Sequence, residues 1–239
     1  MTDDYKNYLS KTSKNYFEKS VVKTEQQRFL ETLLPATLSG HKIADVACGS
    51  GTLSYHLNQK YADQDVHFTL IDYFDDVLDM AKKLNPNPNF SFENGNIYQL
   101  LQHADDSFDY VFCWQTLSWV DEPEKALNEL VRITRPGGKL YLSALFNLDF
   151  DVDIYAKVLN KSEKAVENIP VNYHTISVHT INNWIGKSCK NIQFHRFEPN
   201  IDFHYSGRGL GTFTVNSDKG RLQISGGLLM NWAILEIEK

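Results

Sequence analysis

The sequence has few cysteines, no long hydrophobic run and no excess of positive charge. No apolar run approaches the roughly 20 residues that cross a bilayer, so we expect no membrane-spanning helix. The three cysteines, Cys48, Cys113 and Cys189, are odd in number and far apart, which argues against a disulfide framework and a cysteine metal site. The formal net charge of −6 gives a nucleic-acid partner no long-range attraction.

The first residues also lack the basic and apolar segments of a signal peptide. Together with the cysteine pattern, this predicts reduced thiols and a cytoplasmic location. With 239 residues, the chain is long enough for one well-filled α/β domain and short for two. We therefore expect a single domain over residues 1–239.

The most informative stretch is Ile43-Ala44-Asp45-Val46-Ala47-Cys48-Gly49-Ser50-Gly51-Thr52-Leu53. A short apolar run stops at small residues and a helical pattern follows, which predicts a buried strand, a tight turn and a helix N-terminus. Glycines in such a turn permit positive φ and the close approach of a ligand. About twenty residues later, Asp72 ends a second apolar run, where an acid can accept both hydroxyls of a ribose. This spacing predicts a nucleoside-containing cofactor.

Strand and helix patterns alternate regularly up to residue 145, which predicts a doubly wound, mostly parallel sheet. The expected strands cover residues 43–46, 66–71, 90–93, 108–114 and 139–145, and the expected helices residues 24–34, 53–61, 75–84 and 123–134. Residues 135–138 are expected to form a turn.

The pattern loosens after residue 146. We expect helices over 153–167 and 180–187, an irregular stretch over 199–220, and strands over 191–197 and 228–237. Two late strands that follow each other closely favour an antiparallel edge on the parallel sheet.

These motifs together resemble the class I S-adenosylmethionine-dependent methyltransferases. Asp45-Val46-Ala47-Cys48-Gly49-Ser50-Gly51 corresponds to the family's glycine motif, with Ala47 in place of its first glycine. Asn96 stands where the family commonly has Asp, and residues 108–112, 117–123 and 135–139 match later segments. The resemblance covers about half of the chain and implies a seven-stranded Rossmann-like sheet with an antiparallel edge strand. Residues 1–34 would then be N-terminal helices or a lid, 35–146 the cofactor-binding core, and 147–239 the elements covering the substrate.

The resemblance implies S-adenosylmethionine as methyl donor and S-adenosylhomocysteine as product. Asp45 would anchor the amino-acid moiety or cap the glycine loop, Asp72 would bind the ribose, and Asn96 would contact the adenine. We expect Gln115 beside the methionine moiety or the methyl group, and substitution of Gly51 by valine to impair binding more than stability. The expected cofactor contacts are Asp45, Ala47, Gly49, Gly51, Asp72, Tyr73, Asn96, Ile97, Trp114 and Gln115.

The residues expected to face the acceptor are fewer. A histidine near its usual pKa is a natural base for a hydroxyl nucleophile, and His174 and His204 are preferred because we expect both in irregular stretches. Arg208, flanked by glycines, can reach a phosphate or carboxylate, and Trp119 is a further candidate contact. Tyr8, with Tyr5, Tyr16 and Phe17, can form an aromatic lid, although such a stripe also suits simple packing.

Asp149, Asp151 and Asp153 alternate like calcium ligands, but no glycine or distal glutamate follows at the required spacing, so we expect no metal site.

We therefore expect a methyltransferase for a small polar molecule, with O-methylation of a hydroxyl on a sugar, a nucleotide-linked sugar or a small acid preferred. N-methylation of a small amine and a non-catalytic cofactor-binding module of a complex stay open. A nicotinamide-dependent oxidoreductase is disfavoured, because Ser54 stands where its fingerprint needs glycine and Asp45 lies within the first strand. Neither a membrane nor a nucleic-acid partner is expected, since Trp114-Gln115-Thr116-Leu117 replaces the segment that base-amine methyltransferases carry.

Overall fold

The computed structural model describes residues 22–159, 161, 170–198, 202, 204, 212–217, 220–225, 228–229 and 232–239. The expectations for Tyr5, Tyr8, Tyr16, Phe17 and Arg208 concern residues outside this part of the chain. Among the described residues, no helix combines the length and the apolar composition that crossing a bilayer requires. Cys48, Cys113 and Cys189 are free thiols.

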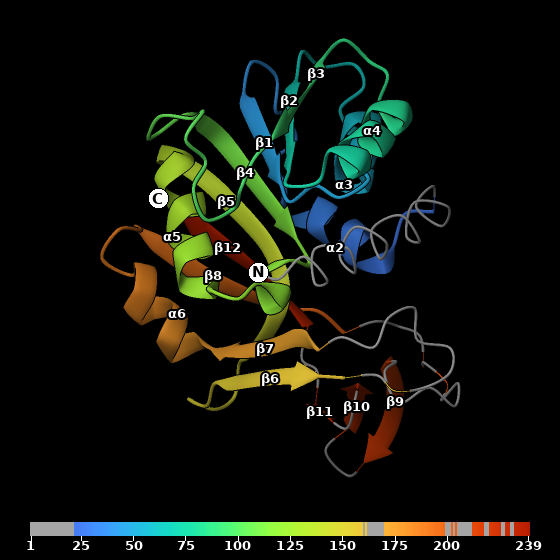
Figure 1. The fold of residues 1–239 in the computed structure, drawn as a ribbon, viewed down its shortest axis with the longest axis vertical. Helices are drawn as coiled ribbons and strands as arrows, with labels where there is room; N and C mark the ends of the chain where they lie inside the picture. The colour runs from blue at the N-terminus through green and yellow to red at the C-terminus, as the bar shows by residue number, and fades with distance from the viewer. Residues whose placement is uncertain are drawn as a thin grey trace.

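A sheet whose main path has the strand order β3-β2-β1-β4-β5-β12-β8 forms the centre of the molecule (Figure 1). Its strands are β1 (Lys42–Val46), β2 (His67–Asp72), β3 (Phe90–Asn94), β4 (Phe108–Trp114), β5 (Thr134–Asn147), β8 (Asn191–Arg196) and β12 (Trp232–Glu238). The first five strands of this path run parallel, whereas β12 pairs antiparallel with both β5 and β8. This confirms the doubly wound Rossmann-like sheet and its antiparallel edge.

Helices cover both faces of the sheet (Figure 1). On one face lie α2 (Glu25–Leu33), α3 (Thr52–Lys60) and α4 (Asp75–Leu84), and on the other α5 (Pro123–Ile133) and α6 (Val178–Ile185). Each face has its own apolar core, because successive side chains of a strand point to opposite sides. Leu30, Leu57, Phe112 and Tyr141 belong to the first core, whereas the buried residues of α5 and α6 belong to the second.

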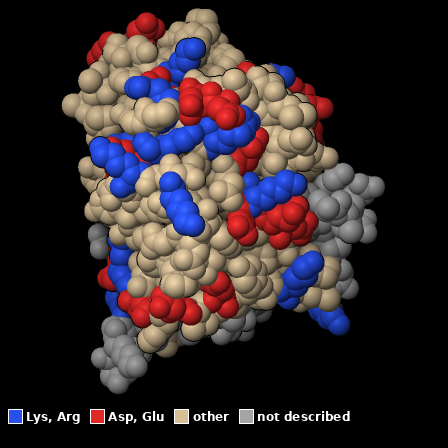
Figure 2. All heavy atoms as spheres, turned by 90° about the vertical axis from the view of Figure 1, so that its left-hand side faces the viewer, with Lys and Arg blue, Asp and Glu red and all other residues tan. Residues whose placement is uncertain are grey.

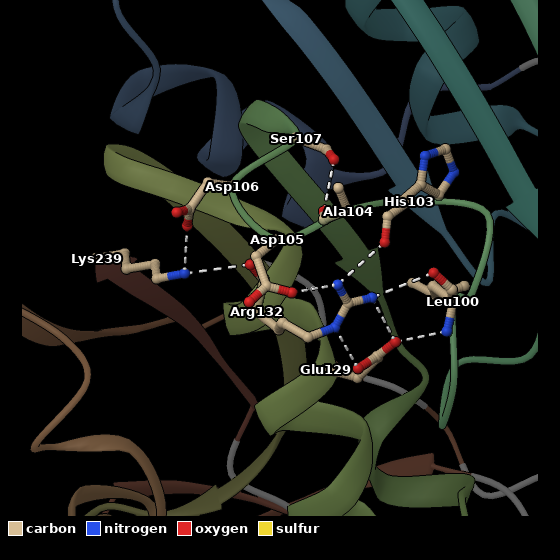
Figure 3. Close-up of polar contacts among 9 residues, drawn as sticks. All are labelled: Leu100, His103, Ala104, Asp105, Asp106, Ser107, Glu129, Arg132 and Lys239. Atoms are coloured by element: carbon tan, nitrogen blue, oxygen red, sulfur yellow. Dashed lines mark hydrogen bonds and ion pairs between the residues drawn. The ribbon is translucent and has the colours of Figure 1, made fainter.

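Arg132 of α5 holds the connection between β3 and β4 against this helix (Figure 3). Its guanidinium donates to both carboxylate oxygens of Glu129, each at 2.8 Å, and to Asp105 Oδ1 at 2.7 Å. It also donates to the carbonyl oxygens of His103 (3.0 Å) and Leu100 (3.2 Å). The contacts with Leu100, His103 and Asp105 tie residues 100–105 to α5.

The second half of the chain contains more strand than the pattern predicts. The expected helix over 153–167 is wrong where the structure describes it, because β6 (Ile154–Val158) pairs antiparallel with β7 (Val171–Ser177). Exposure alternates along β6, which is the two-residue period of a strand. The predicted irregular stretch over 199–220 contains β9 (Thr212–Ser217), which forms a separate three-stranded sheet with β10 (Gly220–Ser225) and β11 (Leu228–Leu229).

Two predicted strand boundaries also need correction. The expected strand over 228–237 is divided between β11 and β12, which belong to different sheets. β5 begins at Thr134, so the predicted turn lies within it; the pairing with β4 shifts there, and Gly137 has a φ of +73°. The four residues therefore bulge from the ladder.

Candidate active site

The glycine turn between β1 and α3 forms a concave loop at the carboxyl end of the sheet. Ala47, Gly49 and Gly51 have φ values of +55°, +57° and +72°, so every second residue is left-handed. Such alternation turns backbone N–H groups to one side and favours an anionic or polar ligand. Ala47 adopts this conformation despite its Cβ, so the replacement of the first glycine of the motif leaves the loop intact.

The two glycines of the turn have different surroundings. A Cβ at Gly49 would meet no atom of the protein within 4 Å, whereas one at Gly51 would lie 2.7 Å from Asn85 Nδ2 and 2.8 Å from Leu70 Cδ2. Gly49 therefore leaves space for a ligand, and Gly51 allows α3 to pack on α4. The prediction that valine at 51 would impair binding more than stability conflicts with this packing.

Asp72, at the end of β2, supports the glycine turn. Its Oδ2 accepts a hydrogen bond from the Gly49 N–H (2.9 Å), and its Oδ1 accepts one from the Phe74 N–H (3.1 Å). Only 7% of the residue is exposed, and this burial raises the pKa of Asp72, an effect that hydrogen bonds from the Gly49, Phe74 and Tyr73 N–H groups oppose. A carboxylate has about four acceptor positions, so these backbone donors leave room for a hydrogen bond from a ribose hydroxyl.

Asp45 lies beneath the same turn, at 1% exposure. Ser54 Oγ donates to its Oδ2 (2.6 Å), and Oδ1 has no hydrogen-bond partner among the described residues. Burial raises the pKa of Asp45 to about 7, with a smaller contribution from the negative charge of Asp72 and against the effect of the Ser54 hydrogen bond. An uncompensated buried oxygen at a ligand site is a feature that a bound cation or donor would satisfy.

The third strand brings the adenine-side candidates to the same edge. Asp72 and Asn94 are paired across β2 and β3, and Asn96 follows two residues later. Asn96 is exposed, and its Oδ1 accepts the Tyr98 N–H (3.0 Å), so one oxygen lone pair and the NH₂ group stay available. Ile97 is partly buried beside this turn, and Tyr73 is 41% exposed after β2.

At the end of β4, Trp114 packs partly buried against the first core and Gln115 is exposed. Gln115 has a φ of +52°, an uncommon conformation for a residue other than glycine. Its Nε2 donates to Oε1 of Gln26 on α2 (3.0 Å). The sequence pattern did not identify Gln26 as a site residue. Gln26 lies three positions before Phe29 and four before Leu30, so it falls on the apolar face of the predicted helix, and a polar residue on that face could have indicated a site.

The acceptor-side candidates are only partly brought together. Trp119, in the short 3₁₀ helix η1 (Leu117–Trp119), packs edge-on against Tyr173 of β7 with ring centroids 4.5 Å apart. Its carbonyl oxygen accepts from Nδ2 of the buried Asn172 (3.2 Å). Trp119 is thus fixed between the ends of β4 and β7.

The expectation that His174 lies in an irregular stretch is wrong. It lies within β7, where it is 5% exposed. Burial lowers the pKa of His174, against a hydrogen bond with the Val120 backbone, so the ring is neutral near pH 7. Its Nδ1 has no hydrogen-bond partner among the described residues. His204 is exposed.

Asp149 and Asp153 have structural contacts. Asp149 forms an ion pair with Arg196 (2.7 Å), and Asp153 accepts from the Ser177 N–H and Thr180 Oγ1, both at 2.7 Å, at the start of α6.

A family model described as a methyltransferase domain matches residues 44–142. The demethylmenaquinone methyltransferase of Renibacterium salmoninarum is 31% identical over 151 residues, which cover 62% of this chain and 61% of that protein. The ubiquinone biosynthesis O-methyltransferase of Coxiella burnetii is 30% identical over 124 residues, 51% of this chain and 50% of that protein. The chain thus spans about half to three-fifths of the length of these curated relatives.

Among solved structures, phospholethanolamine N-methyltransferase 2 of Haemonchus contortus, in complex with phosphomonomethylethanolamine and S-adenosylhomocysteine, has a similar fold. The TM-score is 0.60 at 13% identity, over 90% of this chain and 52% of that one. The family match covers the glycine turn, Asp72 and β4, where the site residues described above lie. Residues 44–142 therefore form a methyltransferase domain of the class I S-adenosylmethionine-dependent family.

Proposed function

We propose that this protein transfers the methyl group of S-adenosylmethionine to a hydroxyl oxygen of a small polar acceptor. The observation that supports this best is the order of side chains along the carboxyl edge of the sheet. Asn96, Asp72, the glycine turn and Gln115 follow the neighbouring strands β3, β2, β1 and β4. The adenine, ribose and amino-acid groups of S-adenosylmethionine follow one another in the same order, with the adenine at Asn96 and the ribose at Asp72.

The residues of the turn fit this cofactor. The space beside Gly49 accepts a ligand against the backbone, Asp72 keeps acceptor capacity for a ribose hydroxyl, and the buried Asp45 Oδ1 suits an ammonium group. When bound, S-adenosylmethionine supplies an activated methyl group. The protein's own residues hold the two reactants in line and exclude water, which accounts for much of the catalysis in a displacement of this kind.

A hydroxyl acceptor loses its proton as the carbon–oxygen bond forms, so a nearby neutral base helps. His174 is neutral near pH 7 and keeps an unpaired Nδ1 among the described residues, which supports it as that base, with His204 as the second candidate. One of the relatives, the ubiquinone biosynthesis O-methyltransferase of Coxiella burnetii, methylates oxygen, which supports a hydroxyl acceptor.

The charge pattern on one face of the molecule supports a small molecule over a nucleic acid as acceptor. On the face shown in Figure 2, basic and acidic side chains lie next to one another without a broad patch of one sign. Ion pairs such as Lys190–Glu238 (2.6 Å) and Lys239–Asp106 (2.8 Å) illustrate this mixing. A nucleic-acid surface would instead gather positive charge.

The test is release of S-adenosylhomocysteine when the protein meets S-adenosylmethionine and panels of sugars, nucleotide-linked sugars, hydroxy acids, phenols and hydroquinones. We expect turnover in one hydroxyl-bearing panel and a product heavier by one methylene. Turnover only with amines would favour N-methylation. Tight binding of S-adenosylhomocysteine without turnover in any panel would favour the non-catalytic module, and no binding would overturn the proposal.

A further inference from the structure

A cavity of about 560 Å³ lies between α3 and the turn of residues 85–89 that joins α4 to β3. Its wall includes Phe90, the first residue of β3, whereas Asn94, which is paired with Asp72, is the last residue of that strand. The cavity therefore lies at the opposite end of β3 from the proposed ribose and adenine positions. Its volume is in the range of small-molecule sites, and the proposed methyl transfer does not use it.

The wall of this cavity is neutral and rich in amides. None of the described residues that line it is charged, and its side-chain amides belong to Asn58, Gln59, Asn85 and Asn87. An amide can both donate and accept hydrogen bonds, as a hydroxyl group does. A charged ligand would lose hydration here without gaining a counter-charge. The wall therefore suits an uncharged ligand with several hydroxyl groups.

The turn of residues 85–89 holds its amides in a stiff frame. Asparagine alternates with proline along it, and Pro86 and Pro88 each fix their own φ and restrict the residue before them. Asn87 Oδ1 accepts a hydrogen bond from the Asn89 N–H (2.9 Å), which leaves the NH₂ group of Asn87 for a ligand. A stiff frame lowers the entropic cost of binding.

Asn85 is the group in this wall whose hydrogen bonds the fold leaves incomplete. The residue is 3% exposed, and its Nδ2 donates to the carbonyl oxygens of Gly51 (3.2 Å) and Ala81 (3.1 Å). Both amide hydrogens are therefore used within the protein. Its Oδ1 has no hydrogen-bond partner among the described residues, which is rare for a buried polar atom. Asn85 thus brings an unused acceptor to the cavity wall.

The aromatic side chains of the wall favour a sugar over a nucleobase. Phe90 is only 9% exposed, and its ring is stacked with those of Phe68 and Phe92, at centroid distances of 5.0 and 6.3 Å. It offers no open ring for a base to stack on, and stacking is how proteins usually hold an isolated base. A sugar needs only the amides for its hydroxyl groups, and its C–H groups can pack on the partly buried Tyr55.

We propose that this cavity binds an uncharged sugar, one of whose hydroxyl groups donates a hydrogen bond to Asn85 Oδ1. The NH₂ group of Asn87 donates to a second oxygen of the sugar, and the Asn58 amide binds a further hydroxyl group from the α3 side. The protein then has a second small-molecule site, separate from the one for the methyl donor.

The test is titration of the full chain with glucose, galactose, mannose, maltose and cellobiose, followed by ¹H–¹⁵N NMR. We expect at least one sugar to shift the side-chain NH₂ signals of Asn85 in a saturable way. The phosphate ester of the same sugar should bind at least about tenfold more weakly, because the described wall offers its charge no partner.

Three variants locate the site. Asn85→Leu should lower the affinity for that sugar about tenfold, because it removes the buried acceptor. Asn58→Leu keeps the Asn85 contacts, so it tests the site even where Asn85→Leu folds poorly, and we expect about a fivefold loss. Asn128→Leu on α5 is the matched control and should leave the affinity unchanged, since α5 covers the other face of the sheet.

Three results overturn this inference. They are binding of none of the five sugars, equal binding of a sugar and its phosphate ester, and equal affinity of the wild type, Asn85→Leu and Asn58→Leu for the sugar. Each of them leaves the proposed methyl transfer untouched, because that proposal is tested by release of S-adenosylhomocysteine.

Discussion

Asn85, the residue that follows α4, donates a hydrogen bond from Nδ2 to the carbonyl oxygen of Gly51 (3.2 Å), the residue that precedes α3. The same Nδ2 also donates to the carbonyl oxygen of Ala81 (3.1 Å). One buried amide thus joins the glycine turn to the helix that follows β2. This contact explains why the two glycines of the turn have different roles.

Gly51→Ala should destabilise the protein by about 2–4 kcal/mol, because the new Cβ would meet Asn85 and Leu70 and the φ is left-handed. Gly49→Ala should cost only about 1–2 kcal/mol, since its Cβ has free space. Denaturant unfolding measures both values. Titration with S-adenosylhomocysteine should show the reverse order, with a loss of affinity in Gly49→Ala; equal effects of the two changes on both quantities would contradict this division.

Asp72→Asn should weaken cofactor binding by on the order of 2–4 kcal/mol, because a charge-assisted acceptor is lost at the ribose position. It should also lower stability, since Asp72 accepts the Gly49 and Phe74 N–H groups. Calorimetry at a temperature where the variant is fully folded separates the two effects. Unchanged affinity for S-adenosylhomocysteine would remove Asp72 from the ribose site.

Asp45 should make the free protein less stable as pH rises. Its pKa in the folded state, about 7, lies above the ordinary aspartate pKa of 3.8, so the folded state keeps a proton that the unfolded state has released. The contribution of Asp45 to stability is complete below about pH 4 and is lost as pH rises through 7. Between pH 5.5 and pH 8, the free energy of unfolding should therefore fall by about 2 kcal/mol. Urea unfolding at both pH values measures it, and Asp45→Asn should lack most of this difference. A variant with the wild-type pH dependence would show that another group is responsible.

Arg132→Gln should lower stability by about 1.5–3 kcal/mol, because it removes a guanidinium that donates to Glu129 and to two backbone carbonyl groups (Figure 3). Asp105→Asn is the control: this partner is 74% exposed, so its loss should cost less than 0.5 kcal/mol. Thermal unfolding of both variants provides the comparison. Equal losses of stability in the two variants would show that the contacts of Arg132 with Glu129 and with the two backbone carbonyl groups add nothing beyond its ion pair with Asp105.

His174→Gln should reduce kcat by about a hundredfold or more with little change in S-adenosylhomocysteine affinity, if the acceptor hydroxyl loses its proton to Nδ1. His204→Ala is the parallel variant for the second candidate. Steady-state kinetics with the acceptor found in the panels gives both values. Full activity in both variants would mean that alignment of the reactants is sufficient without a histidine base.

The sequence by itself determined the cofactor-binding half. The apolar run before the glycine turn, Asp72 at the end of the next run and the nearly unbroken apolar strand at 108–114 each depend on neighbours within a few positions. Local periodicity and turn chemistry act over that range, so the strands and helices up to residue 133 lie close to the predicted boundaries. The family resemblance followed from the same local motifs.

Tertiary structure alone decided the second half and the partners of the site residues. β6 is a strand because it pairs with β7. The sequence of these few residues alone fits a strand and a turn of helix equally well. Gln26 meets Gln115, and Gly51 meets Asn85, across 89 and 34 positions of sequence. Whether a polar side chain is buried and which groups it meets depends on the packing of distant elements, and no local pattern contains that information.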